Sequence, residues 1–241
     1  MIAYTGVASV YLLDAVSYGI LLGALFFMTA HGRIEGERKP ASAASVMEGL
    51  RFVKSKTLIW STMLLDFFST MFAEATILLP VFAKDILHVG PEYLGFLYAA
   101  PFIGATLIGL IAASIGKRIH TGNVLLFSVA IYAIGTIAFG LSTNYWVSLA
   151  TLMVVGAGDG MSAIIRNIMR QMNTPDHIRG RMTAINQIFY TGGPRLGEVE
   201  GGLVAGLVGT QASVILGGFG TLLTVVIMGL TIPLLRTYKE Q

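Results

Sequence analysis

The chain has 241 residues, of which 54% are hydrophobic and only 12% are charged, and its net charge is +3. Soluble domains carry about 25% charged residues, so this composition excludes an ordinary soluble domain and indicates a chain solvated by lipid. The sequence contains no cysteine, which excludes disulfides and thiol chemistry.

Long apolar runs predict the fold class. A backbone inside a bilayer has to satisfy its own hydrogen bonds, either as a helix or as a closed barrel. The apolar runs are about 20 residues long and show no strict alternation of apolar and polar residues, which favours helices. We therefore expect an all-α integral membrane protein with about seven transmembrane helices. The predicted spans are residues 7–30, 57–82, 93–115, 122–141, 145–165, 182–208 and 211–235.

The basic residues between these spans predict an orientation. From the N-terminus, the successive loops and the tail hold 6, 1, 2, 0, 4, 0 and 2 Lys and Arg residues. The loops on one side of the membrane therefore carry 14 of them and the loops on the other side carry 1. Because cytoplasmic loops are the basic ones, we expect the N-terminus outside and the C-terminus in the cytoplasm.

The linker 31–56 is the longest connection between the predicted spans. Its second part has an apolar stripe at helical spacing, formed by Val46, Leu50 and Val53. This pattern predicts a short amphipathic helix on the cytoplasmic surface of the membrane. A plain linker without a fixed position is the alternative.

Charged residues inside the predicted spans are candidate functional groups, because each one costs roughly 2.5–3.5 kcal/mol to insert. Asp66 lies about 13 Å into its span, close to the midplane, and Glu74 follows on the same predicted helix. We expect both carboxylates to border one cavity. A carboxylate in apolar surroundings holds a proton more readily than one in water, so the two are candidates for substrate binding and proton coupling. A structural hydrogen bond to a neighbouring helix is the alternative.

A charged pair interrupts the predicted span 182–208. Arg195 and Glu198 lie at neighbouring positions of a helix, i and i+3. They are candidates for a substrate-binding or coupling pair that breaks during transport, or they neutralise each other to lower the cost of insertion. Glycine recurs there at every fourth residue, at Gly193, Gly197 and Gly201. This spacing predicts close packing against another helix.

Other charges have an expected structural or gating role. Asp159 and Arg166 lie seven residues apart and share one helix face. We expect Asp159 to form a structural or gating salt bridge near the cytoplasmic end, with Lys117 and Arg118 as candidate partners. Asp14, in the first span, is expected at a helix contact.

Several stretches resemble the major facilitator superfamily of transporters. Within residues 109–118, the family's loop motif G-x-x-x-D-R-x-G-R/K is matched at Gly109, Gly116 and Lys117, whereas Ala113 and Ser114 replace its Asp and Arg. Residues 174–181 are similar to the linker before the family's eleventh span. Residues 48–53 and 192–198 resemble the branch that contains bacterial enterobactin exporters and drug-efflux proteins.

This resemblance implies a domain organisation and a function. Residues 1–30 resemble the sixth span of the family, 31–56 its cytoplasmic linker, and 57–241 its C-terminal half of six helices. The family has twelve spans, so the resemblance implies a partial chain whose partner is the missing N-terminal half. It also implies a secondary active transporter of the bacterial inner membrane, which exports a small amphiphilic molecule such as a drug or siderophore in exchange for protons.

Other classes of function remain as alternatives. A seven-helix receptor would share the predicted orientation, but a retinal protein needs a lysine in its last span and residues 211–235 contain none. A membrane enzyme would need a nucleophile with a base or a metal cluster, and the four histidines show no metal-binding spacing, so we expect no enzyme, cofactor or metal. A non-transporting structural fragment is the third alternative. The expected partners are the lipid bilayer, a small substrate and protons, with no nucleic acid.

Overall fold

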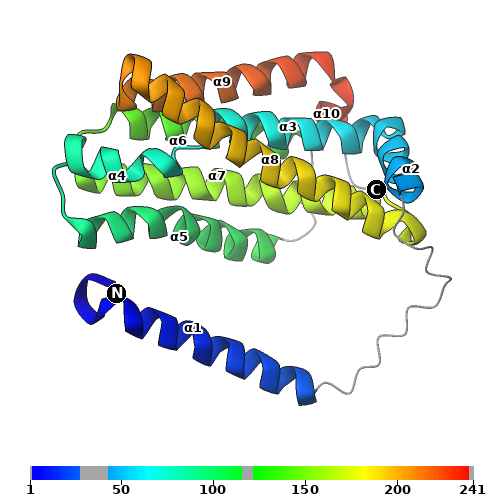
Figure 1. Cartoon of the computed structure of the whole chain (residues 1–241). Coiled ribbons are helices and arrows are strands. Elements are labelled where there is room, and N and C mark those ends of the chain that lie inside the picture. Colours follow the sequence, from blue (N-terminus) through cyan, green and yellow to red (C-terminus); the bar gives the residue numbers. More distant parts are fainter. Residues whose placement is uncertain (1, 28–42, 116–121, 239–241) are drawn as a thin grey trace. The chain divides into compact units, whose positions relative to one another are not determined.

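The computed structural model describes residues 2–27, 43–115 and 122–238, and in these ranges the chain is helical without any strand (Figure 1). The chain divides into two compact units, Met1–Pro40 and Ala41–Gln241. The prediction of an all-α membrane fold is confirmed.

In the first unit the described residues, 2–27, form one helix, α1 (Ile2–Phe27). With 26 residues it is about 39 Å long, enough to cross the ~30 Å hydrocarbon core of a bilayer. Its part Ala8–Phe27 is apolar enough for a membrane span. One helix has no hydrophobic core of its own, so lipid or other helices have to cover it.

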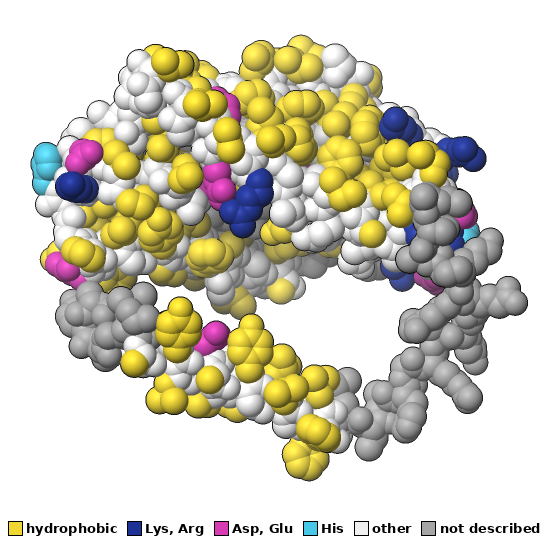
Figure 2. Space-filling model, viewed as in Figure 1, with side chains coloured by type: hydrophobic (Ala, Val, Ile, Leu, Met, Phe, Trp, Pro, Cys, Tyr) yellow, Lys and Arg dark blue, Asp and Glu magenta, His cyan; other side chains and the backbone are white. Residues whose placement is uncertain are grey.

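The second unit contains the remaining helices. They are α2 (Ala43–Ser55), α3 (Thr57–Ala73), η1 (Thr76–Leu78), α4 (Leu79–Val81), η2 (Phe82–Ile86), α5 (Pro91–Ile115), α6 (Gly122–Leu141), α7 (Tyr145–Met172), α8 (Asp176–Val208), α9 (Thr210–Thr231) and α10 (Pro233–Thr237). Figure 2 shows hydrophobic side chains over the visible face of this unit, with Lys and Arg gathered mainly at its ends. Such a surface is suited to lipid, and Phe102 and Leu207 are 75% and 85% exposed on it.

Six stretches among the described residues are long and apolar enough to cross a membrane: Ala8–Phe27, Thr57–Ile86, Pro91–Ser114, Gly122–Leu141, Tyr145–Met172 and Thr210–Thr231. They correspond to six of the seven predicted spans. The seventh predicted span lies in α8, which has 33 residues and is long enough. It does not meet the same criterion because its start contains Asp176, Arg179 and Arg181 and its later part contains Arg195, Glu198 and Glu200.

The second predicted span, residues 57–82, is expected to be one continuous helix, but the structure divides it into several pieces. The α-helix α3 ends at Ala73, and Glu74 takes an extended conformation with φ −72° and ψ 98°. The Glu74 carboxylate then accepts a hydrogen bond from the backbone N–H of Thr76 at 3.0 Å. Pro80, which has no N–H to donate, lies in the first turn of the next helical piece, where its ring is tolerated. Glu74 is therefore not on the same helix as Asp66.

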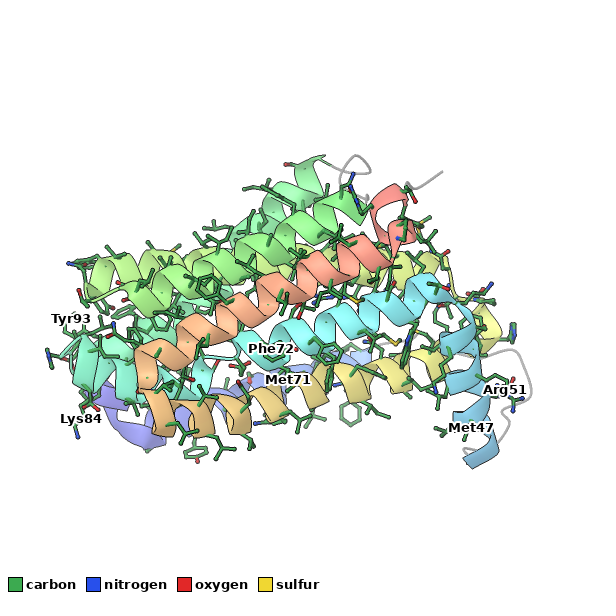
Figure 3. All side chains as sticks on the ribbon, turned by 90° about the horizontal axis from the view of Figure 1, so that it is seen from above. Met47, Arg51, Met71, Phe72, Lys84 and Tyr93 are labelled. Atoms are coloured by element: carbon green, nitrogen blue, oxygen red, sulfur yellow. The ribbon has the colours of Figure 1, made fainter. Side chains whose placement is uncertain are left out.

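Glycines bring α3 into direct backbone contact with α8 and α9. A methyl group at Gly197 of α8 would lie 2.3 Å from the Met71 carbonyl oxygen, and one at Gly217 of α9 would lie 2.1 Å from that of Phe72. Figure 3 shows α3 in cyan between these two helices, with Met71 and Phe72 at its end. The prediction that the glycine repeat of α8 packs against another helix is confirmed.

The helix α2 packs against α8 and α3. Val53 of α2 is fully buried in a cluster with Met63 of α3 and Ile185 of α8. The opposite side of α2 is open, because Met47 is 55% exposed, and Figure 3 shows Met47 and Arg51 pointing away from the helix bundle. A second cluster joins Leu235 of α10 to Leu125 of α6, so the short C-terminal helix closes one end of this unit.

Candidate functional site

A buried ion pair joins α3 and α7. The Arg166 Nη2 atom of α7 lies 2.9 Å from the Asp66 Oδ1 atom of α3, and the two side chains are 2% and 1% exposed. Taking two ions out of water costs several kcal/mol each, and neither ion is tolerated in such a place without the other. Each residue of the pair therefore fixes the position of its partner.

Two further side chains of α7 hold the Arg166 guanidinium. Its Nη1 atom donates to the Ser162 hydroxyl at 2.9 Å, and its Nη2 atom lies 3.5 Å from Asp159 Oδ1. Asp159, Ser162 and Arg166 share one helix face because they are three and four residues apart. The Asp159 side chain is 45% exposed, so Arg166 bridges a fully buried carboxylate and a partly accessible one.

The hydrogen bonds around Asp66 are incomplete. The short distance to Arg166 lacks the geometry of a hydrogen bond at Asp66 Oδ1. Within the described residues, Asp66 Oδ2, Ser69 Oγ and Arg166 Nε are also buried without a hydrogen-bond partner. Native proteins leave few buried polar atoms in this state, and those that occur often mark functional sites. A proton on the carboxyl group, or a change of partner, would relieve the mismatch.

A second buried arginine lies one turn further along α7. Arg170 is 4% exposed and donates to Asn167 of its own helix and to Asn186 of α8. The predicted span 145–165 ended before Arg166 and Arg170, but α7 continues to Met172 and contains both. Their spacing of four residues, which places both on one helix face, is the signal that could have revealed them.

A cavity of about 150 Å³ lies beside the break in the second span. We name it the helix-break cavity and define it by its lining residues Ala73, Glu74, Ala75, Thr76, Leu79, Pro101, Tyr132, Thr136, Phe139, Leu152, Val155, Gly156 and Asp159. It contains Glu74 and Asp159 but not Asp66, so this cavity does not bring Asp66 and Glu74 together. The reason is the break itself, because Glu74 leaves α3 and no longer follows its helical rotation.

The predicted pair Arg195–Glu198 forms within α8. Arg195 Nη1 donates to both carboxylate oxygens of Glu198, at 2.9 and 3.0 Å. The Arg195 side chain is 72% exposed and that of Glu198 is 30% exposed. Each charge of this pair therefore has its counter-ion on the same helix.

The other predicted residues are less informative. Asp14 lies in α1, where its backbone carbonyl accepts a hydrogen bond from the Ser17 hydroxyl at 2.7 Å. Lys117 and Arg118 lie outside the described residues. The partner of Arg166 that sequence reasoning missed is Asp66, far away along the chain.

Comparisons with known proteins give one family. A family model described as a transmembrane secretion effector matches residues 1–241. The chain is 27% identical to the enterobactin exporter EntS of Escherichia coli (strain UTI89 / UPEC) over 198 residues, which cover 81% of this chain and 47% of that protein. It is 26% identical to EntS of Escherichia coli O1:K1 / APEC over 196 residues, again 81% of this chain and 47% of the relative. The chain thus spans about half the length of the curated relatives that it matches.

Proposed function

Because the chain belongs to the transmembrane secretion effector family of major facilitator transporters, we propose that it forms part of a secondary active exporter in which Asp66 carries the coupling proton. The chain is a multi-pass membrane protein of this transporter family and not an enzyme. The exported molecule would be small and amphiphilic, such as a drug or a siderophore, and the names of the relatives support the second choice.

The buried Asp66–Arg166 pair carries this proposal. When Asp66 is ionised, it neutralises Arg166 at 2.9 Å. When Asp66 is protonated, Arg166 loses that counter-ion, and Asp159, 3.5 Å away, is the next carboxylate within reach. Proton binding would thus transfer the guanidinium from a buried carboxylate on α3 to a more exposed one on α7. Two arrangements of one charge, selected by a proton, are what an antiporter needs to link proton uptake to a conformational change.

The orientation and the partner are parts of the same proposal. The excess of basic residues in alternate loops supports an outside N-terminus and a cytoplasmic C-terminus in the bacterial inner membrane. Major facilitator transporters bind substrate between two six-helix halves. Since the chain spans about half the length of its relatives, the transport pathway would need an N-terminal half as its partner.

An export assay tests the proposal. The chain is expressed with an N-terminal half, either its own upstream coding sequence or that of the E. coli relative, in a strain without other efflux pumps. Export of a dye or a siderophore is measured before and after a protonophore collapses the proton gradient. We expect gradient-dependent export that Asp66→Asn abolishes, whereas Asp176→Asn, at an 89% exposed surface pair with Arg179, leaves it unchanged. Export without a gradient would contradict proton coupling. If the chain exports nothing with either of the two N-terminal halves, it is better explained as a non-transporting structural fragment.

A further inference from the structure

The helix-break cavity has a polar end that the proposed exchange at Asp66 does not use. Glu74 enters it from the break in the second span, and Asp159 enters it from α7. The hydroxyl-bearing residues Tyr132 and Thr136 of α6 line the same cavity. All four side chains offer oxygen atoms, which are the ligands that hard cations prefer.

The two carboxylates of this cavity have one arginine between them among the described residues. Glu74 accepts a hydrogen bond from the backbone N–H of Thr76, and no basic side chain approaches it within salt-bridge distance. The arginine near Asp159 is Arg166, at 3.5 Å, and that arginine is also 2.9 Å from Asp66. The C-terminal end of α3, which carries the negative pole of the helix dipole, also lies at the cavity wall. The cavity therefore has an excess of negative charge.

Tyr132 supplies an independent indication of a ligand. Its side chain is only 7% exposed and lines the cavity, and the side-chain hydrogen bonds found in the described part of the chain include none to its hydroxyl. Thr136 is 2% exposed and donates its hydroxyl hydrogen to the Tyr132 carbonyl at 3.0 Å, which leaves the lone pairs of its oxygen for another partner. Hydroxyl groups that line an internal cavity normally meet a partner, from the protein or from a bound molecule.

The size of the cavity decides which cation fits. Sites for drug-sized ligands have volumes of about 300–1,000 Å³, and the helix-break cavity, at about 150 Å³, is smaller. One water occupies roughly 30 Å³ of liquid, so the cavity has room for an ion with a few waters. No group of three or more His, Cys, Asp or Glu side chains occurs in the described ranges, which disfavours a divalent metal.

We infer that the helix-break cavity binds a small, partly hydrated monovalent cation such as sodium, held by Glu74 and Asp159 with Tyr132 and Thr136 as neutral ligands. Broken helices place backbone and carboxylate oxygens around cations inside membranes in this way. The bound cation neutralises the surplus charge beside the break in the second span. It also competes with Arg166 for Asp159, so its presence favours the Asp66–Arg166 pair.

Binding of sodium is tested on the purified full chain in detergent micelles or nanodiscs, without substrate or gradient. Thermal unfolding is followed by the fluorescence of the two tryptophans while sodium chloride replaces choline chloride at constant ionic strength. At a sodium concentration 100-fold above half-saturation, we expect the unfolding midpoint to rise by about 5 °C. Glu74→Gln and Asp159→Asn should each raise the half-saturating concentration about tenfold or more, and Tyr132→Phe should raise it less. Glu92→Gln, at the start of α5 and outside the cavity, is the matched control and should leave the titration unchanged.

Two results would overturn the inference. One is that sodium stabilises the wild-type chain no more than choline does. This measurement needs no variant, so it does not depend on whether Glu74→Gln folds. The other is a sodium effect that persists in the double variant Glu74→Gln/Asp159→Asn. If methylammonium stabilises the chain in the first of these cases, the cavity is assigned to an organic amine instead. None of these measurements depends on export, so their outcome is separate from that of the export assay.

Discussion

Arg166 of α7 and Asp66 of α3 approach to 2.9 Å in a place where both side chains are almost completely buried. The pair links two helices whose sequences are far apart, and it is the most deeply buried charged contact in the described part of the chain. Its two members should therefore depend on each other for stability as well as for function.

The first prediction concerns this dependence. Arg166→Gln leaves the Asp66 carboxylate buried without a counter-ion and should destabilise the chain by about 3–5 kcal/mol. The double variant Arg166→Gln/Asp66→Asn removes both charges and should recover much of this loss. Chemical unfolding in detergent, arranged as a double-mutant cycle, measures the coupling. A double variant whose destabilisation equals the sum of those of the two single variants would show that the two charges do not interact.

The second prediction concerns the contact between α8 and α3. Gly197→Ala places a methyl group 2.3 Å from the Met71 carbonyl oxygen and should destabilise the chain by about 1–3 kcal/mol, because backbone atoms cannot move away freely. Gly202→Ala is the matched control on the same helix, since nothing lies within 4 Å of the added methyl group. A thermal melt that shifts equally for both variants would contradict the close contact of the two backbones.

The third prediction concerns the docking of α2. Val53 is fully buried against α3 and α8, so Val53→Asp should detach α2 and speed amide hydrogen exchange in residues 43–55. Met47→Asp, at a 55% exposed position of the same helix, should leave that exchange unchanged. Glu48→Gln should also change little, because the Glu48–Arg181 pair at 2.8 Å is partly exposed. The exchange of α6 and α7 serves as an internal reference, and faster exchange there would indicate general unfolding instead.

The fourth prediction concerns the C-terminal helix α10. Leu235 is fully buried in the cluster with Leu125, and Leu235→Ala should cost about 2–5 kcal/mol in stability. Its neighbour Leu234 is 45% exposed, so Leu234→Ala should cost far less. Unfolding midpoints of the two variants provide the comparison. Similar values for both would show that α10 does not close the end of this unit.

The spans and the glycine contacts could be predicted from the sequence because both depend on local patterns. Apolar windows follow from the thickness of a bilayer, and the repeat of Gly193, Gly197 and Gly201 follows from the geometry of one helix. The Asp66–Arg166 pair could not be predicted in this way. It joins distant parts of the chain, and the apolar window 145–165 ended just before Arg166.

The break after Ala73 could be predicted only in part from the sequence. The sequence contains a signal for it, because Pro80 cannot continue the hydrogen bonding of a helix that began at Thr57. The signal does not say which residue leaves the helix. That choice depends on the Glu74 carboxylate, which accepts the Thr76 N–H at 3.0 Å, and on glycines of α8 and α9 that bring other backbones against the end of α3.

The break also gives the second span a joint. Bending a continuous helix breaks backbone hydrogen bonds, and in lipid each lost bond is expensive. At Glu74 the backbone is extended and the α-helical bonding is already interrupted, so α3 and the helical pieces that begin at Thr76 can tilt against each other with fewer bonds to lose. The stiffness of this span is therefore set by side-chain packing around the joint and not by the helix itself. Small changes in that packing, such as the substitution of one residue that packs against Gly197, would alter how readily the span bends.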